Sequence, residues 1–516
     1  MTALPLLTLI VFTPFGGALM LALLPREPDA GLRRAALVFS LVPLALSLWM
    51  LARFEPADGG FQFVERAAWI PAWGATYHLG VDGVSLFLVV LTTVLTPIVL
   101  LDSWGNVHRR VKDFLVLMLL LEAGMLGTLV ALDLFLFYVF WEVMLVPMVL
   151  LIGVWGGPRR VYAAVKFVLF TMAGSLPMLL AIVYLGWRAK DGGGAMGFDY
   201  ERFLALSLTG REQLALFLAF ALAFAIKVPL FPFHTWLPDA HTEAPTGGSV
   251  ILAGVMLKMG TYGFLRFALP LFPEAVGTLA PVIAALAVIG IVYGALVATV
   301  QPDLKRLVAY SSVSHLGFVM LGLAALTPTA VVGSVYQMLN HGLSTGALFL
   351  LVGMIYERRH TRMIADFGGL WSVVPVFSAC LLVAMLASAG LPGLNGFVGE
   401  FLILLGAFGR WPWATAVATS GVVLGALYLL WMYERTIFGP VVHEETRRLV
   451  DIGTRELVVI TPVLALCFVM GLYPTPILRR IEPAVARTIA TVQRRSAPAA
   501  VAAASVRPAR SAAGRP

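Results

Sequence analysis

Residues 133–155 read DLFLFYVFWEVMLVPMVLLIGVW, an apolar run that begins at Asp133 and has a second carboxylic acid, Glu142, near its middle. A helix needs about 20 predominantly apolar residues to cross a lipid bilayer, so this run predicts a membrane-spanning helix. A charged side chain at the centre of such a helix costs about 2.5–3.5 kcal/mol on insertion scales. Because that cost has to be offset inside the protein, we expect Glu142 to have a buried partner or a functional role.

Apolar runs of similar length recur along nearly the whole chain. Only 12% of the 516 residues are charged, which is about half the usual share in a soluble domain. The sequence therefore predicts an all-α integral membrane protein with about fourteen transmembrane helices. The expected helices cover residues 3–24, 31–53, 80–101, 113–131, 133–155, 161–186, 212–230, 247–270, 277–299, 303–325, 331–356, 373–408, 412–437 and 455–474.

The charged and sulfur-containing residues argue against several classes of function. The formal net charge is +8, but the Lys and Arg residues lie in short loops and in the C-terminal tail, so no nucleic-acid surface is predicted. Cys380 and Cys467 lie far apart in separate apolar runs and form no cluster or disulfide motif. No glycine-rich nucleotide-binding motif occurs. We expect no cofactor and no metal in this chain.

Basic residues in alternate loops predict the orientation in the membrane. The basic loops lie around residues 26–34, 109–112, 159–160, 305–306, 358–362 and 447–448. The positive-inside rule places these loops in the cytoplasm. With an even number of helices, both termini are then expected on the opposite side, although the C-terminal tail is itself basic.

Two groups of five helices, residues 112–270 and 271–438, form a weak internal repeat. The fourth helix of each group contains a proline break, at Lys227-Val228-Pro229 and at Leu391-Pro392-Gly393. Because five is an odd number, two such units lie upside down relative to each other, which is a transporter architecture. The other expected segments are three N-terminal helices (1–111), a last transmembrane helix (439–488) and a disordered tail rich in Ala, Pro and Arg (489–516).

Six ionisable residues at membrane depth form the predicted proton path. They are Glu142, Lys227, Lys258, His315, His341 and Glu400. A nearby carboxylate controls whether a buried lysine keeps its proton, and histidine titrates nearest to neutral pH. Carbonyl groups freed by the two helix breaks can hold water beside Lys227 and Glu400. We interpret the set as a route for protons or small cations.

Structural roles are the alternative interpretation. Glu142 and Lys227 can form a purely structural ion pair, and His315 and His341 can simply hydrogen-bond between helices. A structural role is also favoured for Glu122. Two further groups are expected to cap short helices or face water, namely His234, Asp239, His241 and Glu243, and Asp303, Lys305 and Arg306.

Five motifs together resemble one family of membrane proteins. They are residues 80–85, 132–147, 225–246, 303–315 and 391–401. The motifs are similar to those of the antiporter-like subunits of respiratory NADH:quinone oxidoreductase (complex I), multisubunit cation/proton antiporters and membrane-bound hydrogenases. The resemblance covers roughly residues 80–480. Within the family the chain looks most like the subunit M type, because Glu400 stands where related subunits usually have lysine.

The resemblance implies a proton-translocating membrane subunit of NADH:quinone oxidoreductase without redox chemistry of its own. It implies that Glu142 and Lys227 form the coupling ion pair and that the other four residues continue the path. NADH, FMN, iron–sulfur clusters and quinone are expected in partner subunits, and the flanking partners are antiporter-like subunits L and N in the bacterial inner membrane. A subunit of a sodium/proton antiporter or of a membrane-bound hydrogenase, and a non-conducting membrane scaffold, remain alternatives.

Overall fold

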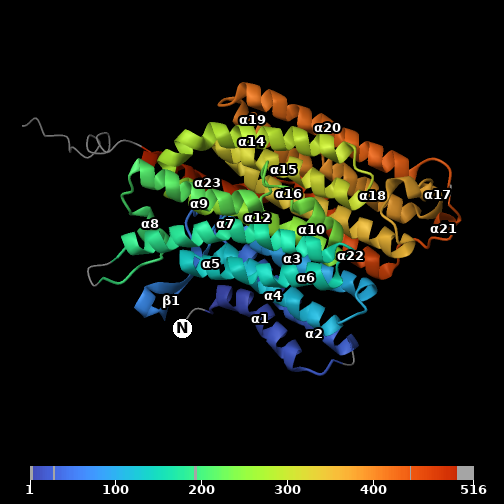
Figure 1. The fold of residues 1–516 in the computed structure, drawn as a ribbon, viewed down its shortest axis with the longest axis horizontal. Helices are drawn as coiled ribbons and strands as arrows, with labels where there is room; N and C mark the ends of the chain where they lie inside the picture. The colour runs from blue at the N-terminus through green and yellow to red at the C-terminus, as the bar shows by residue number, and fades with distance from the viewer. Residues whose placement is uncertain (1–3, 27–28, 191–193, 442, 497–516) are drawn as a thin grey trace, which may run out of the picture.

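The computed structural model describes residues 4–26, 29–190, 194–441 and 443–496. It is a bundle of roughly parallel helices with one small β-hairpin beside them (Figure 1). The first helices are α1 (Leu6–Leu23), α2 (Asp29–Arg53), α3 (Ser85–Asn106), α4 (Val111–Val130), α5 (Leu134–Val143), α6 (Leu145–Trp155), α7 (Arg160–Arg188), α8 (Tyr200–Leu204), α9 (Gly210–Lys227), α10 (Leu237–Glu243), α11 (Thr246–Ile251), α12 (Leu257–Gly263) and α13 (Leu269–Leu271). The later ones are α14 (Pro273–Thr299), α15 (Leu304–Ala325), α16 (Pro328–Arg359), α17 (Leu370–Val373), α18 (Pro375–Ser388), α19 (Asn395–Phe408), α20 (Pro412–Ile437), α21 (Glu444–Arg447), α22 (Thr454–Leu472) and α23 (Thr475–Ser496).

Within the described residues, 12 helices are long and apolar enough to cross a membrane, which confirms a multi-pass helical membrane protein. The other expected crossings correspond to α9 and to the pair α18 and α19. The 18 residues of α9 include Arg211, Glu212 and Lys227, and α18 and α19 have 14 residues each. The two expected crossings are therefore interrupted where proline was predicted to break them: α9 ends at Lys227, and the second crossing is divided between Ser388 and Asn395. The number of about fourteen crossings stays a prediction.

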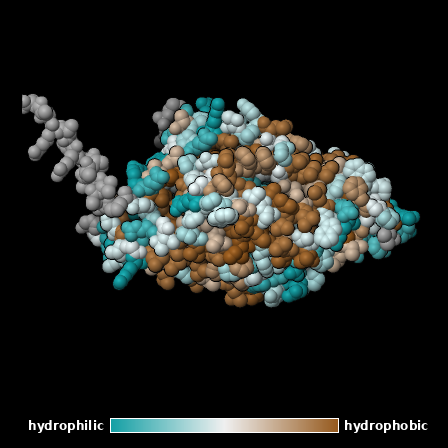
Figure 2. Space-filling model, turned by 90° about the horizontal axis from the view of Figure 1, so that it is seen from above, coloured by the Kyte–Doolittle hydropathy of each residue, from teal (hydrophilic) through white to brown (hydrophobic). Residues whose placement is uncertain are grey.

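The helices divide into a buried centre and a lipid-facing rim. Helices α15 and α16 and the continuous segment from α11 to α13 are almost entirely covered by other helices. Helix α7, at the rim, exposes an apolar stripe with helical spacing at Val161, Val165, Leu169, Leu176 and Leu180. Figure 2 shows hydrophobic side chains over the middle of one face and hydrophilic ones gathered towards its two ends. Polar side chains on the central helices are thus shielded from lipid.

The structure confirms the helical membrane architecture and adds one β-hairpin that was not predicted. Strands β1 (Gln62–Ile70) and β2 (Ala75–Val81) pair antiparallel through a short 3-10 turn, η1 (Pro71–Trp73). Gly74 completes the turn with a φ of +71°, a conformation that glycine adopts without steric cost. Residues 80–84 were expected to open the third transmembrane helix. They instead complete β2 and a turn, because the Asp82 carboxylate accepts hydrogen bonds from the N–H groups of Val84 and Ser85 and so begins α3 only at Ser85.

The C-terminal segment also differs from the prediction. Helix α23 continues to Ser496, so residues 489–496 are helical and not disordered; residues 497–516 lie outside the described residues. The expected segment 439–488 accordingly contains α21, α22 and the first part of α23. The reason is a narrow apolar face of α23, which packs against α13, α14 and α16 through Ile481, Ala484, Val485, Ile489 and Val492.

The bundle has two distinct ends, which we name by their contents. The hairpin end comprises residues 54–82, 131–134, 197–213 and α23, which hydrogen bonds join to one another. The basic end comprises residues 22–26, 29–33, 103–112, 155–160, 242–246, 302–306, 358–366 and 446–456, which hydrogen bonds also join to one another. All the basic loops that were predicted to share one side of the membrane therefore meet at one end.

Candidate proton path

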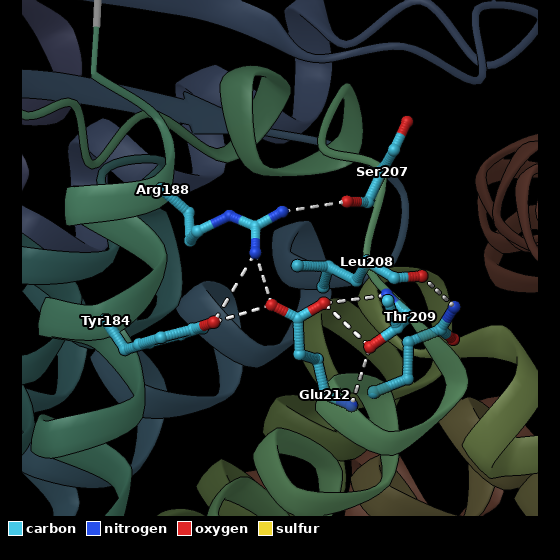
Figure 3. Close-up of polar contacts among 7 residues, drawn as sticks. Tyr184, Arg188, Ser207, Leu208, Thr209 and Glu212 are labelled. Carbon is cyan, nitrogen blue, oxygen red and sulfur yellow. Dashed lines mark hydrogen bonds and ion pairs between the residues drawn. The ribbon is translucent and has the colours of Figure 1, made fainter.

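The first broken helix, α9, is fixed at the hairpin end before it reaches the path. Thr209 and Glu212 form a capping box, in which the Glu212 carboxylate accepts from the Thr209 N–H at 2.8 Å. The same carboxylate accepts from the Tyr184 hydroxyl at 2.5 Å and pairs with Arg188, both on α7 (Figure 3). At 1.5 Å per residue, α9 then places its last residue, Lys227, about 25 Å deeper in the bundle.

Lys227 is buried against aromatic rings at the end of α9. Its Nζ lies 5.2 Å from the ring centre of Trp141 and 5.7 Å from that of Phe167, which are cation–π distances. Glu142 lies within electrostatic range of this lysine, but no ion pair within 4.0 Å joins the two among the described residues. Glu142 Oε1 is buried, and no described residue forms a hydrogen bond with it. The two residues are neighbours, and the expected direct ion pair is not formed in this structure.

Lys258 lies in a continuous helical segment that contains two π-helical stretches, η2 (Leu252–Met256) and η3 (Phe264–Ala268). A π-helical stretch disturbs the regular backbone ladder, and such stretches are frequent at functional sites. Lys258 Nζ donates to the Ala253 carbonyl within η2 and contacts His341 Nδ1 at 2.6 Å. The predicted residues Lys258 and His341 therefore form a direct pair between α12 and α16.

A second direct pair joins His315 on α15 to Glu400 on α19. His315 Nδ1 lies 2.7 Å from Glu400 Oε1, and the Gln337 side chain of α16 donates to the same oxygen at 3.0 Å. The imidazole rings of His315 and His341 have centres 5.9 Å apart and face each other edge-on. Four of the six predicted residues thus form one continuous series, Lys258–His341–His315–Glu400.

Three further polar residues of the site were missed by sequence reasoning. The Tyr428 hydroxyl of α20 lies 3.3 Å from His315 Nε2, and Asn340 donates to Gln337 Oε1 at 3.0 Å. All three side chains are buried. Uncharged Tyr, Gln and Asn residues give no signal in a helical sequence. Their role becomes visible only once it is known which helices, distant in sequence, pack against each other.

The expectation that residues around 234–243 and 303–306 cap short helices or face water is wrong for His234, His241 and Lys305, whereas Asp303 is buried but caps α15. His234 and Lys305 are buried, and Lys305 donates to the Ala244 carbonyl at 2.5 Å. His241 is fully buried, and neither ring nitrogen has a partner among the described residues. Burial lowers the pKa of His241 well below its ordinary value, with smaller effects from Lys305 and Lys258. The neutral His241 ring stacks on Phe349, at 4.6 Å between ring centres.

Glu122 of α4 is the one predicted structural carboxyl whose surroundings show no stabilising contact. It is fully buried, and neither carboxylate oxygen has a hydrogen-bond partner among the described residues. An ionised carboxylate is costly in such a place, so the neutral form is favoured. No hydrogen bond or ion pair between described residues links Glu122 to the proton path.

The chain is similar to a well-defined set of proteins. Residues 131–425 match the transmembrane family described as NADH:quinone oxidoreductase/Mrp antiporter. NADH-quinone oxidoreductase subunit M of Rhodobacter capsulatus is 47% identical over 94% of this chain and 96% of its own length. The subunit M of Mycobacterium tuberculosis is 42% identical over 95% of each chain.

Solved structures of related membrane complexes have the same fold as this chain. A chain of respiratory complex I from Thermus thermophilus superposes with a TM-score of 0.86 at 35% identity, covering 94% of this chain and 99% of its own. A chain of the Mrp complex from a Dietzia species shares the fold, with a TM-score of 0.83 at 21% identity over 96% of this chain and 99% of its own. The chain therefore belongs to the NADH:quinone oxidoreductase/Mrp antiporter family of transmembrane subunits, in its subunit M branch.

Proposed function

We propose that this chain is a proton-translocating subunit of NADH:quinone oxidoreductase and that the six predicted residues are its proton path. The observation that carries the proposal is the buried series Lys258–His341–His315–Glu400, which connects four elements at the centre of the bundle. Each member can hold or release a proton. Lys258 with His341, and His315 with Glu400, lie within hydrogen-bonding distance, and the rings of the two histidines have centres 5.9 Å apart.

The contacts suggest how protons pass along the series. Lys258 Nζ and His341 Nδ1 are within hydrogen-bonding distance, so a proton can move between them without a large displacement. His341 Nε2 has no partner among the described residues and can hand the proton on after a rotation of the ring or through a water molecule. His315 then links this step to Glu400 and to the Tyr428 hydroxyl.

Glu142 and Lys227 form a separate cluster that supports a switching role. A carboxylate that moves towards Lys227 favours the charged lysine, and one that moves away lets burial favour the neutral amine. Glu142 Oε1 has no hydrogen-bond partner among the described residues, so this carboxylate is free to form a new contact when it moves. We propose that this movement opens and closes proton entry to the path.

The two inverted five-helix repeats, residues 112–270 and 271–438, are part of the proposal. Asp133 and Asp303 begin the second helix of each unit with almost the same backbone, φ −102° and ψ 126° against φ −103° and ψ 126°. In the first unit, the Leu134 N–H donates to the Phe198 carbonyl and the Tyr200 N–H donates to the Leu132 carbonyl. The second unit repeats this pattern: the Leu304 N–H donates to the Arg362 carbonyl and the Ile364 N–H to the Pro302 carbonyl. The first set lies at the hairpin end and the second at the basic end, as inverted units require.

The energy for pumping has to come from other subunits. Moving one charge against 100 mV costs about 2.3 kcal/mol, and the path itself contains only groups that carry protons. We propose that NADH oxidation through FMN, iron–sulfur clusters and quinone in partner subunits supplies it. The proposed neighbours are the antiporter-like subunits L and N, and the proposed site is the bacterial inner membrane.

Inverted membrane vesicles that carry Glu400→Gln or Glu142→Gln test the proposal. NADH oxidation and proton uptake are measured together, after quantifying the assembled complex. We expect both rates to fall about tenfold or more in each variant, because one titratable carrier is lost from a proton-transfer route. Glu434→Gln is the matched control, since Glu434 is exposed on α20.

The same vesicles discriminate between the alternatives. Proton movement that depends on a sodium gradient and not on NADH would favour the antiporter. Normal pumping per assembled complex in both variants, with assembly reduced, would favour the scaffold and reject the proton path. Loss of pumping in Glu400→Gln alone would keep the series of four residues and reject the switching role of Glu142.

A further inference from the structure

A basic hollow at the hairpin end is not used by the proton path. It has a volume of about 400 Å³ and opens between α23, the residues before β1 and α8. Four arginines contribute to its wall, namely Arg266, Arg487, Arg494 and Arg495, whereas only two carboxylates do, Asp82 and Glu201. The hollow therefore has an excess of positive charge.

Most of that excess has no ion-pair partner within 4.0 Å among the described residues, although Asp58 lies near Arg487 in the adjoining hollow. Arg266 forms a buried ion pair with Asp82, which accounts for one arginine and one carboxylate. Among the described residues, no ion pair includes Arg487, Arg494 or Arg495. Three arginines thus converge on a space in which Glu201, an exposed residue, is the only other acid.

Arg495 supplies a second, independent observation. Its Nη2 donates to the Leu206 carbonyl at 3.2 Å, while its Nη1 is buried and has no hydrogen-bond partner among the described residues. Burial lowers the pKa of Arg495 from its ordinary value. A buried guanidinium donor without a partner is costly, and a bound anion would remove that cost. Arg487 is held over the Phe61 ring at 6.0 Å, which keeps its guanidinium at the edge of the hollow.

The position of the hollow restricts the anion. The hollow lies at the hairpin end, where Asp82 precedes the span α3 and Arg266 lies near the end of the span Thr246–Leu271, and the amphipathic α23 packs across the same end. Amphipathic helices of this kind lie at the level of the lipid headgroups. A second hollow of about 390 Å³ adjoins it and shares Phe61, Tyr200, Glu201 and Arg487. Guanidinium groups bind phosphate oxygens in a two-pronged geometry that ammonium groups cannot match.

We propose that this hollow binds a phosphate group through Arg487, Arg494 and Arg495, with the adjoining hollow taking the rest of the ligand. The phosphate belongs either to an anionic phospholipid or to free inorganic phosphate. The site lies outside the proton path and does not depend on the function proposed above. It gives a role to the basic charges of α23, which lie at the end opposite to all the basic loops.

The test uses the purified membrane complex in nanodiscs of phosphatidylcholine that contain photoreactive phosphatidylglycerol. We expect light-induced labelling of residues 58–61 and 484–495 in the wild-type chain. Labelling should fall about tenfold in the double variant Arg487→Gln/Arg495→Gln, the change expected when about 1.4 kcal/mol of binding free energy is lost. Arg479→Gln is the matched control, because Arg479 is exposed on the same helix but does not line the hollow.

A second variant keeps the test decisive if the double variant fails to assemble. Thr491→Glu places a carboxylate in the hollow from a half-buried position on α23 and is expected to abolish labelling while the complex stays intact. Protection from labelling by added inorganic phosphate would identify free phosphate as the natural source. Equal labelling by photoreactive phosphatidylcholine, or labelling unchanged in both variants, would overturn the proposal. So would crosslinks from this hollow to acidic residues of a neighbouring subunit without any lipid labelling.

Discussion

At the scale of single residues, the path depends on partners that hold its ionisable groups in place. Glu400 was identified from the sequence because a carboxyl group in an apolar segment stands out, and the same reasoning found Lys258, His315 and His341. The sequence did not show which of these touch, because apolar periodicity gives the depth of a residue but not the neighbouring helix that it faces. Gln337 and Tyr428, which hold Glu400 and His315, carry no charge and gave no signal.

Gly399 tests whether this support matters. A Cβ atom at position 399 would collide with Gln337 Oε1 and lie 2.8 Å from Asn340 Nδ2. Gly399→Ala should therefore displace the amide that donates to Glu400, with an overpacking cost of about 1–3 kcal/mol. We expect fewer protons pumped per NADH oxidised in vesicles, and a lower unfolding temperature of the chain.

Gly409→Ala is the control for this substitution. Gly409 follows the same helix, α19, and a Cβ atom there would meet nothing within 4 Å. It should leave both the pumping ratio and the unfolding temperature unchanged. Equal pumping ratios in the two variants would show that Gln337 does not position Glu400.

At the scale of elements, the apolar helices and both helix breaks were predictable, and the hairpin and α23 were not. Length and hydropathy dominate the sequence signal in a membrane protein, so a β-hairpin of mixed burial between two long apolar runs was overlooked. Aromatic and β-branched residues in 62–70 and 75–81, on either side of the turn Pro71-Ala72-Trp73-Gly74, were the signal that could have found it. In α23, Ala, Pro and Arg suggested disorder, although Ile481, Val485, Ile489 and Val492 repeat with helical spacing.

The contact between the hairpin and residues 197–200 should be sensitive to acid. Burial alone would raise the pKa of Asp199, but His78, the Glu201 N–H group and Arg66 together lower it below its ordinary value near 4. A lowered carboxyl pKa adds stability that is fully present above the ordinary pKa and is lost as the pH falls through the folded-state value. We expect the unfolding temperature to drop as the pH falls below about 4.

Asp199→Asn should remove this dependence. At neutral pH the variant should be less stable by about 1–3 kcal/mol, because hydrogen bonds to a charged group are lost, and its stability should change less between pH 5 and pH 3. Unfolding is followed in detergent at each pH. Asp113→Asn is the control, since among the described residues Asp113 forms its ion pair with the exposed Arg110 at the basic end. A pH profile for Asp199→Asn that parallels the wild-type profile would refute the role of Asp199.

At the scale of the whole molecule, the two ends of the bundle constrain how the chain crosses the membrane. The N-terminal turn of α1 lies at the hairpin end, because the Leu7 N–H donates to Glu65 at 2.7 Å, and α23 lies at the same end. A chain whose two ends share one side crosses an even number of times. The basic loops all lie at the opposite end, so the positive-inside rule places the hairpin end and α23 outside the cytoplasm.

Cysteine labelling tests this orientation. Cys380 and Cys467 are first replaced by alanine, and a single cysteine is then introduced as Ala57→Cys at the hairpin end or Glu444→Cys at the basic end, both exposed positions. We expect a membrane-impermeant maleimide to label only Ala57→Cys in intact cells and only Glu444→Cys in inverted vesicles. The opposite pattern would mean that the arginines of α23, and not the short loops, determine the orientation. The hollow proposed to bind phosphate would then face the cytoplasm, where anionic headgroups and free phosphate are both within its reach.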